Sequence, residues 1–317
     1  MMNIVFLDGY TTNPGDLSWE PFRQFGNFTV YDRTAPADVI ERAKDAEILI
    51  LNKPELTAHH LDQLPKLKFI CVASAGYDTI DVEAARTRNI PVSNAAGYGN
   101  SAVAQMAVAH LLNVTNQVAH YAKINREGFW TKSKDFCNRE HAQIELTDKK
   151  VCIVGYGNIG KRLADLLRPF GVKLFAVTSK PQNELQDVTA ISLQEAFKTC
   201  DIVSLNCPLT SKNNQFINKE LLSQSKRGLI LLNTARGRLV NEQDIADALK
   251  DGQLGAYCCD VLSQEPPTAD NPLLSAPNAH VTPHIAWATT EARQRIIDLL
   301  IDNIKSFLKG KPKRLVN

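Results

Sequence analysis

The segment Val151-Cys-Ile-Val-Gly155-Tyr-Gly157-Asn-Ile-Gly160-Lys-Arg-Leu-Ala164 decides the fold of this chain. Its apolar start is typical of a buried strand, and the residues after Gly160 have the apolar spacing of a helix. Between these elements, the first glycine allows a tight turn, the second lets the backbone approach a pyrophosphate, and the third lets helix and strand pack closely. Because a helix N-terminus attracts phosphate, the segment predicts a dinucleotide site that includes Asn158 and Ile159.

Strand-like and helix-like segments alternate on both sides of this motif. Expected strands lie at 4–7, 28–31, 48–51, 69–73 and 91–92, and then at 151–154, 173–177, 202–205, 229–233, 256–259 and 280–282. Expected helices lie at 18–24, 38–43, 58–64, 101–121, 159–168, 193–198, 219–223, 242–251 and 289–308. This alternation predicts parallel sheets with helices on both faces.

The bulk composition is that of a globular protein. A length of 317 residues indicates two domains, and 44% hydrophobic with 22% charged residues is ordinary. The formal net charge of +2 comes without a dense basic stripe, so we expect no nucleic-acid partner. The sequence contains no apolar stretch long enough to predict a membrane span or a secretory leader. The seven cysteines include no Cys-x-x-Cys pair, which predicts reduced thiols, no metal site and a cytoplasmic location.

The residues after the expected strand 173–177 bear on the choice of cofactor. A dinucleotide site usually carries an Asp or Glu about 20 residues beyond the glycines, where the acid binds the ribose 2′-hydroxyl. Here Thr178, Ser179 and Lys180 stand in its place. One interpretation is that this loop admits the 2′-phosphate of NADP. The other is that these are ordinary turn residues and that NAD binds without a carboxylate.

Three further segments place polar residues directly after expected strands, where open α/β sheets bind ligands. They are Asn233-Thr-Ala-Arg236-Gly, Asp260-Val-Leu-Ser-Gln-Glu265-Pro and Thr282-Pro-His284-Ile-Ala-Trp287. Together with Cys207-Pro208-Leu-Thr, they resemble the D-isomer-specific 2-hydroxyacid dehydrogenases, and the resemblance covers the whole chain. The glycerate dehydrogenase and hydroxypyruvate reductase type is the most similar subgroup. That likeness is carried by Leu7-Asp-Gly-Tyr10, Asn13-Pro-Gly-Asp-Leu-Ser-Trp19, Ala75-Gly-Tyr-Asp78 and the segment Gly97-Tyr-Gly-Asn-Ser-Ala-Val-Ala-Gln105.

The resemblance implies a role for each of these residues. Arg236 would hold the substrate carboxylate, His284 would give the proton to the keto oxygen, and Glu265 would orient the imidazole. Further cofactor contacts are expected from Cys207, Pro208, Thr234 and Asp260. Further substrate contacts are expected from the main chain of Ala75 and Gly76 and from Trp287. The other histidines have no such neighbours in the sequence and are expected to be surface or core residues.

The resemblance also implies the architecture and the reaction. We expect two doubly wound parallel-sheet domains, with a Rossmann cofactor domain at 100–287 inserted in a flavodoxin-like substrate domain at 1–99 and 288–317. The helix from 101 and the irregular segment 123–146 would build a homodimer, although 123–146 is equally read as a surface loop. The expected activity is NAD(P)-dependent oxidation of a D-2-hydroxy acid or reduction of a 2-keto acid. D-Glycerate with hydroxypyruvate is favoured, and glyoxylate comes next. An NAD(H)-sensing, corepressor-like binding protein of the same fold is the alternative.

Overall fold

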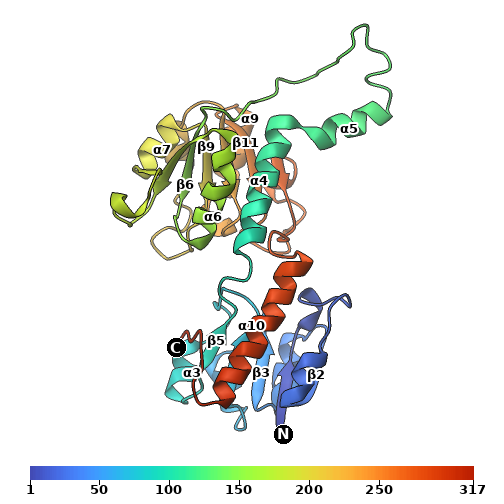
Figure 1. Ribbon diagram of the computed structural model, residues 1–317, viewed down its shortest axis with the longest axis vertical. Helices are drawn as coiled ribbons and strands as arrows, with labels where there is room; N and C mark the ends of the chain where they lie inside the picture. The colour runs from blue at the N-terminus through green and yellow to red at the C-terminus, as the bar shows by residue number, and fades with distance from the viewer. The chain divides into compact units, whose positions relative to one another are not determined.

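The computed structural model describes residues 1–317, which form two compact α/β units. The first unit contains Met1–Gly99 and Trp287–Asn317, and the second contains Asn100–Ala286. In Figure 1 the first unit therefore combines the blue start and the red end of the chain. Trp287 belongs to the first unit, whereas the sequence predicts it at the end of the second.

The first unit is built on a five-stranded sheet with the order β2-β1-β3-β4-β5. Its strands are β1 (Met2–Phe6), β2 (Gly26–Val30), β3 (Ile48–Leu51), β4 (Phe69–Val72) and β5 (Val92–Asn94). All neighbours pair in parallel, and this order is the flavodoxin-like one. The sheet is buried on both faces, which is why β3 and β4 read as uninterrupted apolar runs.

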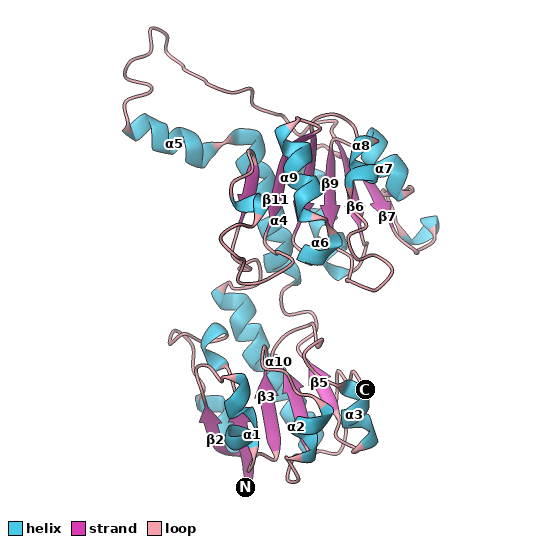
Figure 2. Ribbon diagram, turned by 180° about the vertical axis from the view of Figure 1, so that it is seen from behind, coloured by secondary structure: helices cyan, strands magenta, loops and turns pink.

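Helices cover the two faces of this sheet (Figures 1 and 2). Alternate strand residues, such as Leu49 and Ile70, pack against α1 (Val39–Ala43), α2 (Ala58–Asp62) and α3 (Val82–Thr87). The intervening residues pack against the C-terminal helix α10 (Thr290–Leu308) through its apolar face. The end of the chain thus completes the core formed by its beginning.

The second unit has a seven-stranded sheet with the order β12-β11-β10-β9-β6-β7-β8, and all its pairings are parallel. Its strands are β6 (Lys150–Val154), β7 (Lys173–Val177), β8 (Thr189–Ala190), β9 (Ile202–Leu205), β10 (Leu229–Asn233), β11 (Leu254–Cys259) and β12 (Ala279–Val281). The order reverses between β6 and β9. This is the topology of a dinucleotide-binding doubly wound sheet, in which ligands bind at such a switch point. The predicted fold class is confirmed.

Two layers of helices enclose this second sheet. One face packs against α4 (Asn100–Asn116) and α6 (Asn158–Leu167). The other face packs against α7 (Leu193–Thr199), α8 (Lys219–Ser223) and α9 (Glu242–Lys250), as Figure 2 shows. None of the helices in the structure combines the length and the apolar composition needed to cross a membrane.

The helix predicted over 101–121 is wrong, because the structure has two helices there. The first is α4, and the second is α5 (Val118–Arg126). Gln117 separates them in the left-handed conformation, with φ of 53°. The chain after α5 has no long regular element before β6, and it extends away from the second sheet in both views (Figures 1 and 2). Residues 118–146 are called the arm below.

Candidate active site

The glycine loop joins β6 to α6 and forms one wall of a pocket. An added Cβ at Gly155 would lie 2.6 Å from the backbone nitrogen of Cys207, and one at Gly160 would lie 2.3 Å from the Gly155 carbonyl oxygen. Packing within the protein therefore requires both glycines. A Cβ at Gly157 would meet nothing within 4 Å. Packing within the protein does not require Gly157, which is the N-cap residue of α6. The close approach of a pyrophosphate does require a glycine at this position.

The pocket beside this loop has a volume of about 460 Å³. It is lined by Val154, Gly155, Tyr156, Gly157, Val177, Thr178, Ser179, Lys180, Cys207, Asn213 and Phe216. Gly155, Gly157, Thr178, Ser179, Lys180 and Cys207 are among the cofactor contacts expected from the sequence. Asn158 and Ile159 are the first two residues of α6, and Pro208 is exposed directly after Cys207.

Two buried polar atoms near the carboxyl ends of β9 and β10 have no hydrogen-bond partner. They are Oδ1 of Asn206 and Oγ1 of Thr234. Buried polar atoms are nearly always paired, so both point to a ligand that the protein alone does not supply. Thr234 was expected from the sequence, whereas Asn206 was missed. Its only signal in the sequence is its position between a buried strand and Cys207.

Two lysines lie close together at the loop that the sequence predicts to receive the ribose 2′ position. Lys180 follows β7, and Lys161 lies in the first turn of α6. The pKa of Lys180 is lowered, first by a hydrogen bond to Lys161, then by desolvation and by the like charge of Lys161. A bound anion would relieve this repulsion. The sequence does not predict the proximity of Lys161 to Lys180, because 18 residues separate them along the chain.

The structure brings Glu265 and His284 together. Oε2 of Glu265 lies 2.6 Å from Nδ1 of His284, and Oε1 accepts a hydrogen bond of 3.0 Å from the Leu262 N–H. His284 has a φ of 54°, in the left-handed region, which is uncommon for residues other than glycine. Such strained conformations gather at functional sites. The pair leaves Nε2 of His284 as the ring nitrogen available to a substrate.

Asp260 holds the backbone that carries His284. It is 1% exposed, and its Oδ1 accepts from the Ile285 N–H at 2.9 Å and the Thr282 hydroxyl at 2.6 Å. Its Oδ2 accepts from the Ala286 N–H at 2.7 Å. The carboxylate therefore positions the loop on both sides of His284. The expected contact of Asp260 with the cofactor stays a prediction.

Arg236 follows β10 on the same edge of the second sheet. It is exposed, donates to the Ala235 carbonyl at 2.8 Å and forms no ion pair, so its charge is available to an anion. The buried Asn233 shapes the turn, because its Nδ2 donates to the Arg236 carbonyl at 3.0 Å. An added Cβ at Gly237 would lie 1.9 Å from the carbonyl carbon of Leu262. Gly237 thus allows the Arg236 turn to touch the loop that carries Glu265.

The remaining expected site residues lie in the first unit. The carbonyl of Ala75 accepts from Nδ2 of Asn94 at 2.7 Å, and that of Gly76 accepts from the Ser74 hydroxyl at 2.6 Å. No hydrogen bond in the structure uses the N–H groups of Ala75 and Gly76, so two donors remain for a ligand. Trp287 packs edge-to-face on Tyr98, with ring centroids 6.1 Å apart.

The comparison with known families decides the assignment. Residues 108–286 match the model of the D-isomer specific 2-hydroxyacid dehydrogenase, NAD binding domain. The chain belongs to this dehydrogenase family. It is 39% identical to a hydroxypyruvate reductase of Blautia hydrogenotrophica, with 100% of each chain covered. It is 38% identical to a glycerate dehydrogenase of Methylorubrum extorquens, with 99% of this chain and 98% of the relative covered.

The fold of the chain is also similar to that of a solved structure. An acyclic imino acid reductase (Bsp5) in complex with NADPH and D-Arg superposes with a TM-score of 0.87 at 28% identity, and the match covers 100% of both chains. The predicted family, the predicted enzyme class and the expectation of a nicotinamide cofactor are therefore confirmed. The cofactor fits the observed site, since Gly157 leaves open space and Asn206, beside Gly155, presents an unpaired atom. Thr234 presents a second unpaired atom after β10.

Proposed function

We propose that the protein reduces hydroxypyruvate to D-glycerate, with glyoxylate as its second substrate. The observation that carries the proposal is the Glu265–His284 pair at 2.6 Å, on a sheet edge that also presents the unpaired charge of Arg236. A 2-keto acid has a carboxylate and an adjacent carbonyl, and these two groups require one cation and one proton donor. The full-length likeness to a hydroxypyruvate reductase and a glycerate dehydrogenase supports this substrate.

The chemistry of the residues accounts for each part of the reaction. The planar guanidinium of Arg236 binds the substrate carboxylate through two parallel hydrogen bonds. A nicotinamide dinucleotide held at the loop of Gly155 and Gly157 would supply the hydride that the keto carbon accepts. Nε2 of His284 gives its proton to the keto oxygen, where negative charge develops, and a hydroxyl group results. Glu265 holds Nδ1 of His284, which fixes the orientation of the ring and leaves Nε2 for the substrate.

We propose two further contacts for the substrate from the first unit. The N–H groups of Ala75 and Gly76 bind the carboxylate, because both are unpaired while the carbonyls of the same residues are held. Trp287 provides an apolar wall. For the cofactor, Lys161 and Lys180 favour acceptance of NADPH beside NADH, since they place two positive charges near the 2′ position.

We also propose that the protein is a cytoplasmic homodimer. The arm supports subunit pairing because it exposes large apolar side chains, with Val118 at 69%, Trp130 at 56% and Phe136 at 91%. All seven cysteines are free thiols, which suits a reducing compartment. Light scattering of the purified protein tests the dimer, and a monomer mass at micromolar concentration would contradict it.

Steady-state oxidation of NADH and NADPH with a panel of 2-keto acids tests the function. We expect hydroxypyruvate to give the highest kcat/KM, and we expect His284→Ala to lower kcat by about 100- to 10,000-fold, as the loss of a general acid does. His59→Ala, at an exposed position of α2, is the matched control and should keep full activity. Equal and slow rates of the wild type and His284→Ala on every keto acid would favour the NAD(H)-sensing binding protein instead.

A further inference from the structure

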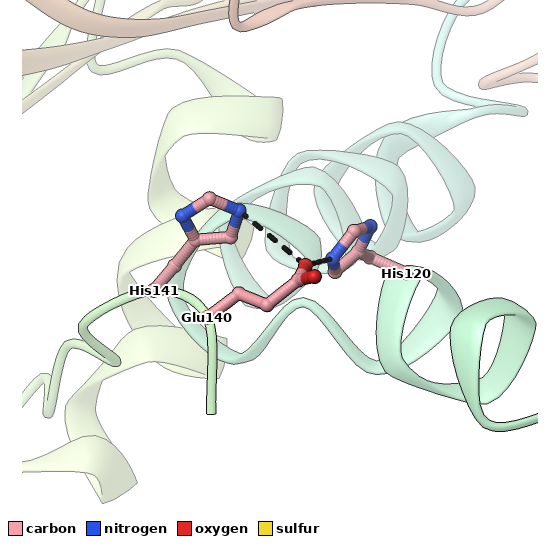
Figure 3. Close-up of side chains that lie close together, drawn as sticks. All are labelled: His120, Glu140 and His141. Carbon is pink, nitrogen blue, oxygen red and sulfur yellow. Dashed lines mark hydrogen bonds and ion pairs between the residues drawn. The ribbon is translucent and has the colours of Figure 1, made fainter. Parts of the chain in front are cut away.

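A cluster of possible metal ligands lies on the arm, away from the strand ends that carry the active-site residues. His120 belongs to α5, and Glu140 and His141 lie in the chain that returns towards β6. Figure 3 shows the two imidazole rings pointing at the Glu140 carboxylate from opposite sides. Nε2 of His120 is 2.7 Å and Nε2 of His141 is 3.9 Å from the same oxygen, Oε2 of Glu140. One ligand atom from each residue lies within 4.8 Å of the other two.

The separations suit a tetrahedral ion. Zinc binds imidazole nitrogen and carboxylate oxygen at roughly 2.0–2.2 Å, so two tetrahedral ligands lie roughly 3.4 Å apart. The observed separations of 2.7 and 3.9 Å lie on either side of this value. Two imidazoles and one carboxylate suit zinc and similar transition metals, whereas calcium and magnesium prefer oxygen ligands alone.

The backbone around the cluster is held by bonds that do not involve the ligand atoms. The hydroxyl of Tyr121 accepts hydrogen bonds from the N–H groups of Glu140 at 3.1 Å and His141 at 3.3 Å. The Ile144 N–H donates to the Thr115 carbonyl at 3.1 Å. These bonds hold the returning chain beside α5 in the absence of an ion. The cluster is therefore organised before binding, which lowers the entropic cost of binding an ion.

We propose that His120, Glu140 and His141 bind one zinc ion, with water in the fourth position, and that the ion ties α5 to the chain returning to β6. The sequence predicts no metal site because 20 positions separate His120 from Glu140, and neither residue lies in a recognisable ligand spacing. The competing interpretation is an ordinary ion pair between His120 and Glu140. His141 lies 3.9 Å from the same Glu140 oxygen, so this ion pair extends to both imidazoles, whereas in the zinc site all three side chains bind one ion.

Isothermal titration of chelator-treated protein with zinc chloride tests the proposal. We expect the wild type to bind one ion per chain. In each of His120→Ala and His141→Ala the dissociation constant should be at least about tenfold larger, because even residues outside the ligand set change metal affinity by about 10- to 100-fold. Two controls should bind as the wild type does. They are His59→Ala and Cys137→Ser, the latter because Cys137 is an exposed thiol of the same arm. Unchanged affinity in the two ligand variants, or lost affinity in Cys137→Ser, would overturn the assignment.

Limited trypsin digestion tests whether the ion ties the arm together. The bond after Arg139 directly precedes the two ligands Glu140 and His141. We expect zinc to slow cleavage at this bond in the wild type and to leave the rate unchanged in His120→Ala, which also controls for any effect of zinc on the protease. Equal effects of zinc on the two proteins would contradict the proposed connection.

Discussion

Replacing Thr178 with aspartate should convert the enzyme towards strict use of NADH. Thr178 follows β7 and lines the pocket beside the glycine loop. Its hydroxyl accepts a hydrogen bond of 3.2 Å from the Lys180 N–H, and an aspartate oxygen can accept the same bond. The substitution therefore keeps the turn and adds one negative charge. That charge stands where dinucleotide sites with a preference for NAD carry their acid.

The size of the effect follows from the charge of the 2′-phosphate. Two unit charges about 4 Å apart repel by about 1 kcal/mol in water and by about 4 kcal/mol at the effective dielectric of a protein surface. A phosphate monoester carries roughly −2 at neutral pH. Because Thr178 is half-buried at an open pocket, screening is close to that of water, and we take about 1–2 kcal/mol for each phosphate charge. The expected repulsion is therefore about 2–4 kcal/mol. The kcat/KM for NADPH should fall by about 30- to 1000-fold, while that for NADH stays the same or rises.

The assay is steady-state reduction of hydroxypyruvate with each cofactor in turn. Thr178→Asn is the matched control, because it keeps an acceptor for the Lys180 N–H without adding charge. The penalty on NADPH should also shrink as salt rises, since exposed charges are screened. If Thr178→Asp and Thr178→Asn lower the NADPH rate equally, Thr178 does not face the 2′-phosphate and the reasoning fails.

Three other predictions follow from single contacts. Lys161→Ala should raise KM for NADPH and leave KM for NADH unchanged, because Lys161 and Lys180 lie together near the 2′ position; equal shifts in both constants would contradict this. Gly237→Ala should lower the free energy of unfolding, measured in urea, by at least about 3 kcal/mol, because its Cβ would lie 1.9 Å from a backbone carbon of Leu262. A loss below about 0.5 kcal/mol would show that the Arg236 turn and the Glu265 loop can separate freely. Burial raises the pKa of Asp8 from 3.8 to about 6, so its stabilising contribution is complete below the lower value and is lost as pH rises through the upper one. Between pH 4 and 7 the wild type should lose about 2 kcal/mol relative to Asp8→Asn in urea unfolding, and parallel pH profiles would refute the shift.

The sequence located every strand except β8, but it merged α4 with part of α5 and did not predict α3 (Val82–Thr87). The expected strand 48–51 coincides with β3, because all four residues are buried and must be apolar on both faces of the sheet. The expected helix 101–121 failed at Gln117, a single residue with φ of 53°. Helical periodicity continues on both sides of this residue, and a pattern of apolar positions does not report the sign of one dihedral angle. The short strand β8 was missed because two exposed residues carry no pattern.

For the site, the sequence located the residues that follow strands, since topology alone brings the carboxyl ends of parallel strands to one edge. Arg236, Glu265 and His284 are of this kind. The sequence does not predict contacts between side chains that come from separate elements. Lys161 with Lys180, and His120 with His141, become neighbours only when helices and loops take their positions. Each of these residues is unremarkable by itself, so no local pattern distinguishes it from a solvated surface residue.

The contacts of Asp260 and Gly237 show that the site depends on backbone placement as much as on the reacting groups. Asp260 satisfies three donors around His284 from a position that is 1% exposed, and its carboxylate needs no contact with substrate to matter. Gly237 lets two loops touch, so that the Arg236 turn and the Glu265 loop share one edge. The left-handed backbone of His284 is strained, and it persists because Asp260 holds the amides that follow it. Small changes in these supporting residues should therefore act on turnover through the position of His284, before any group that touches the substrate is altered.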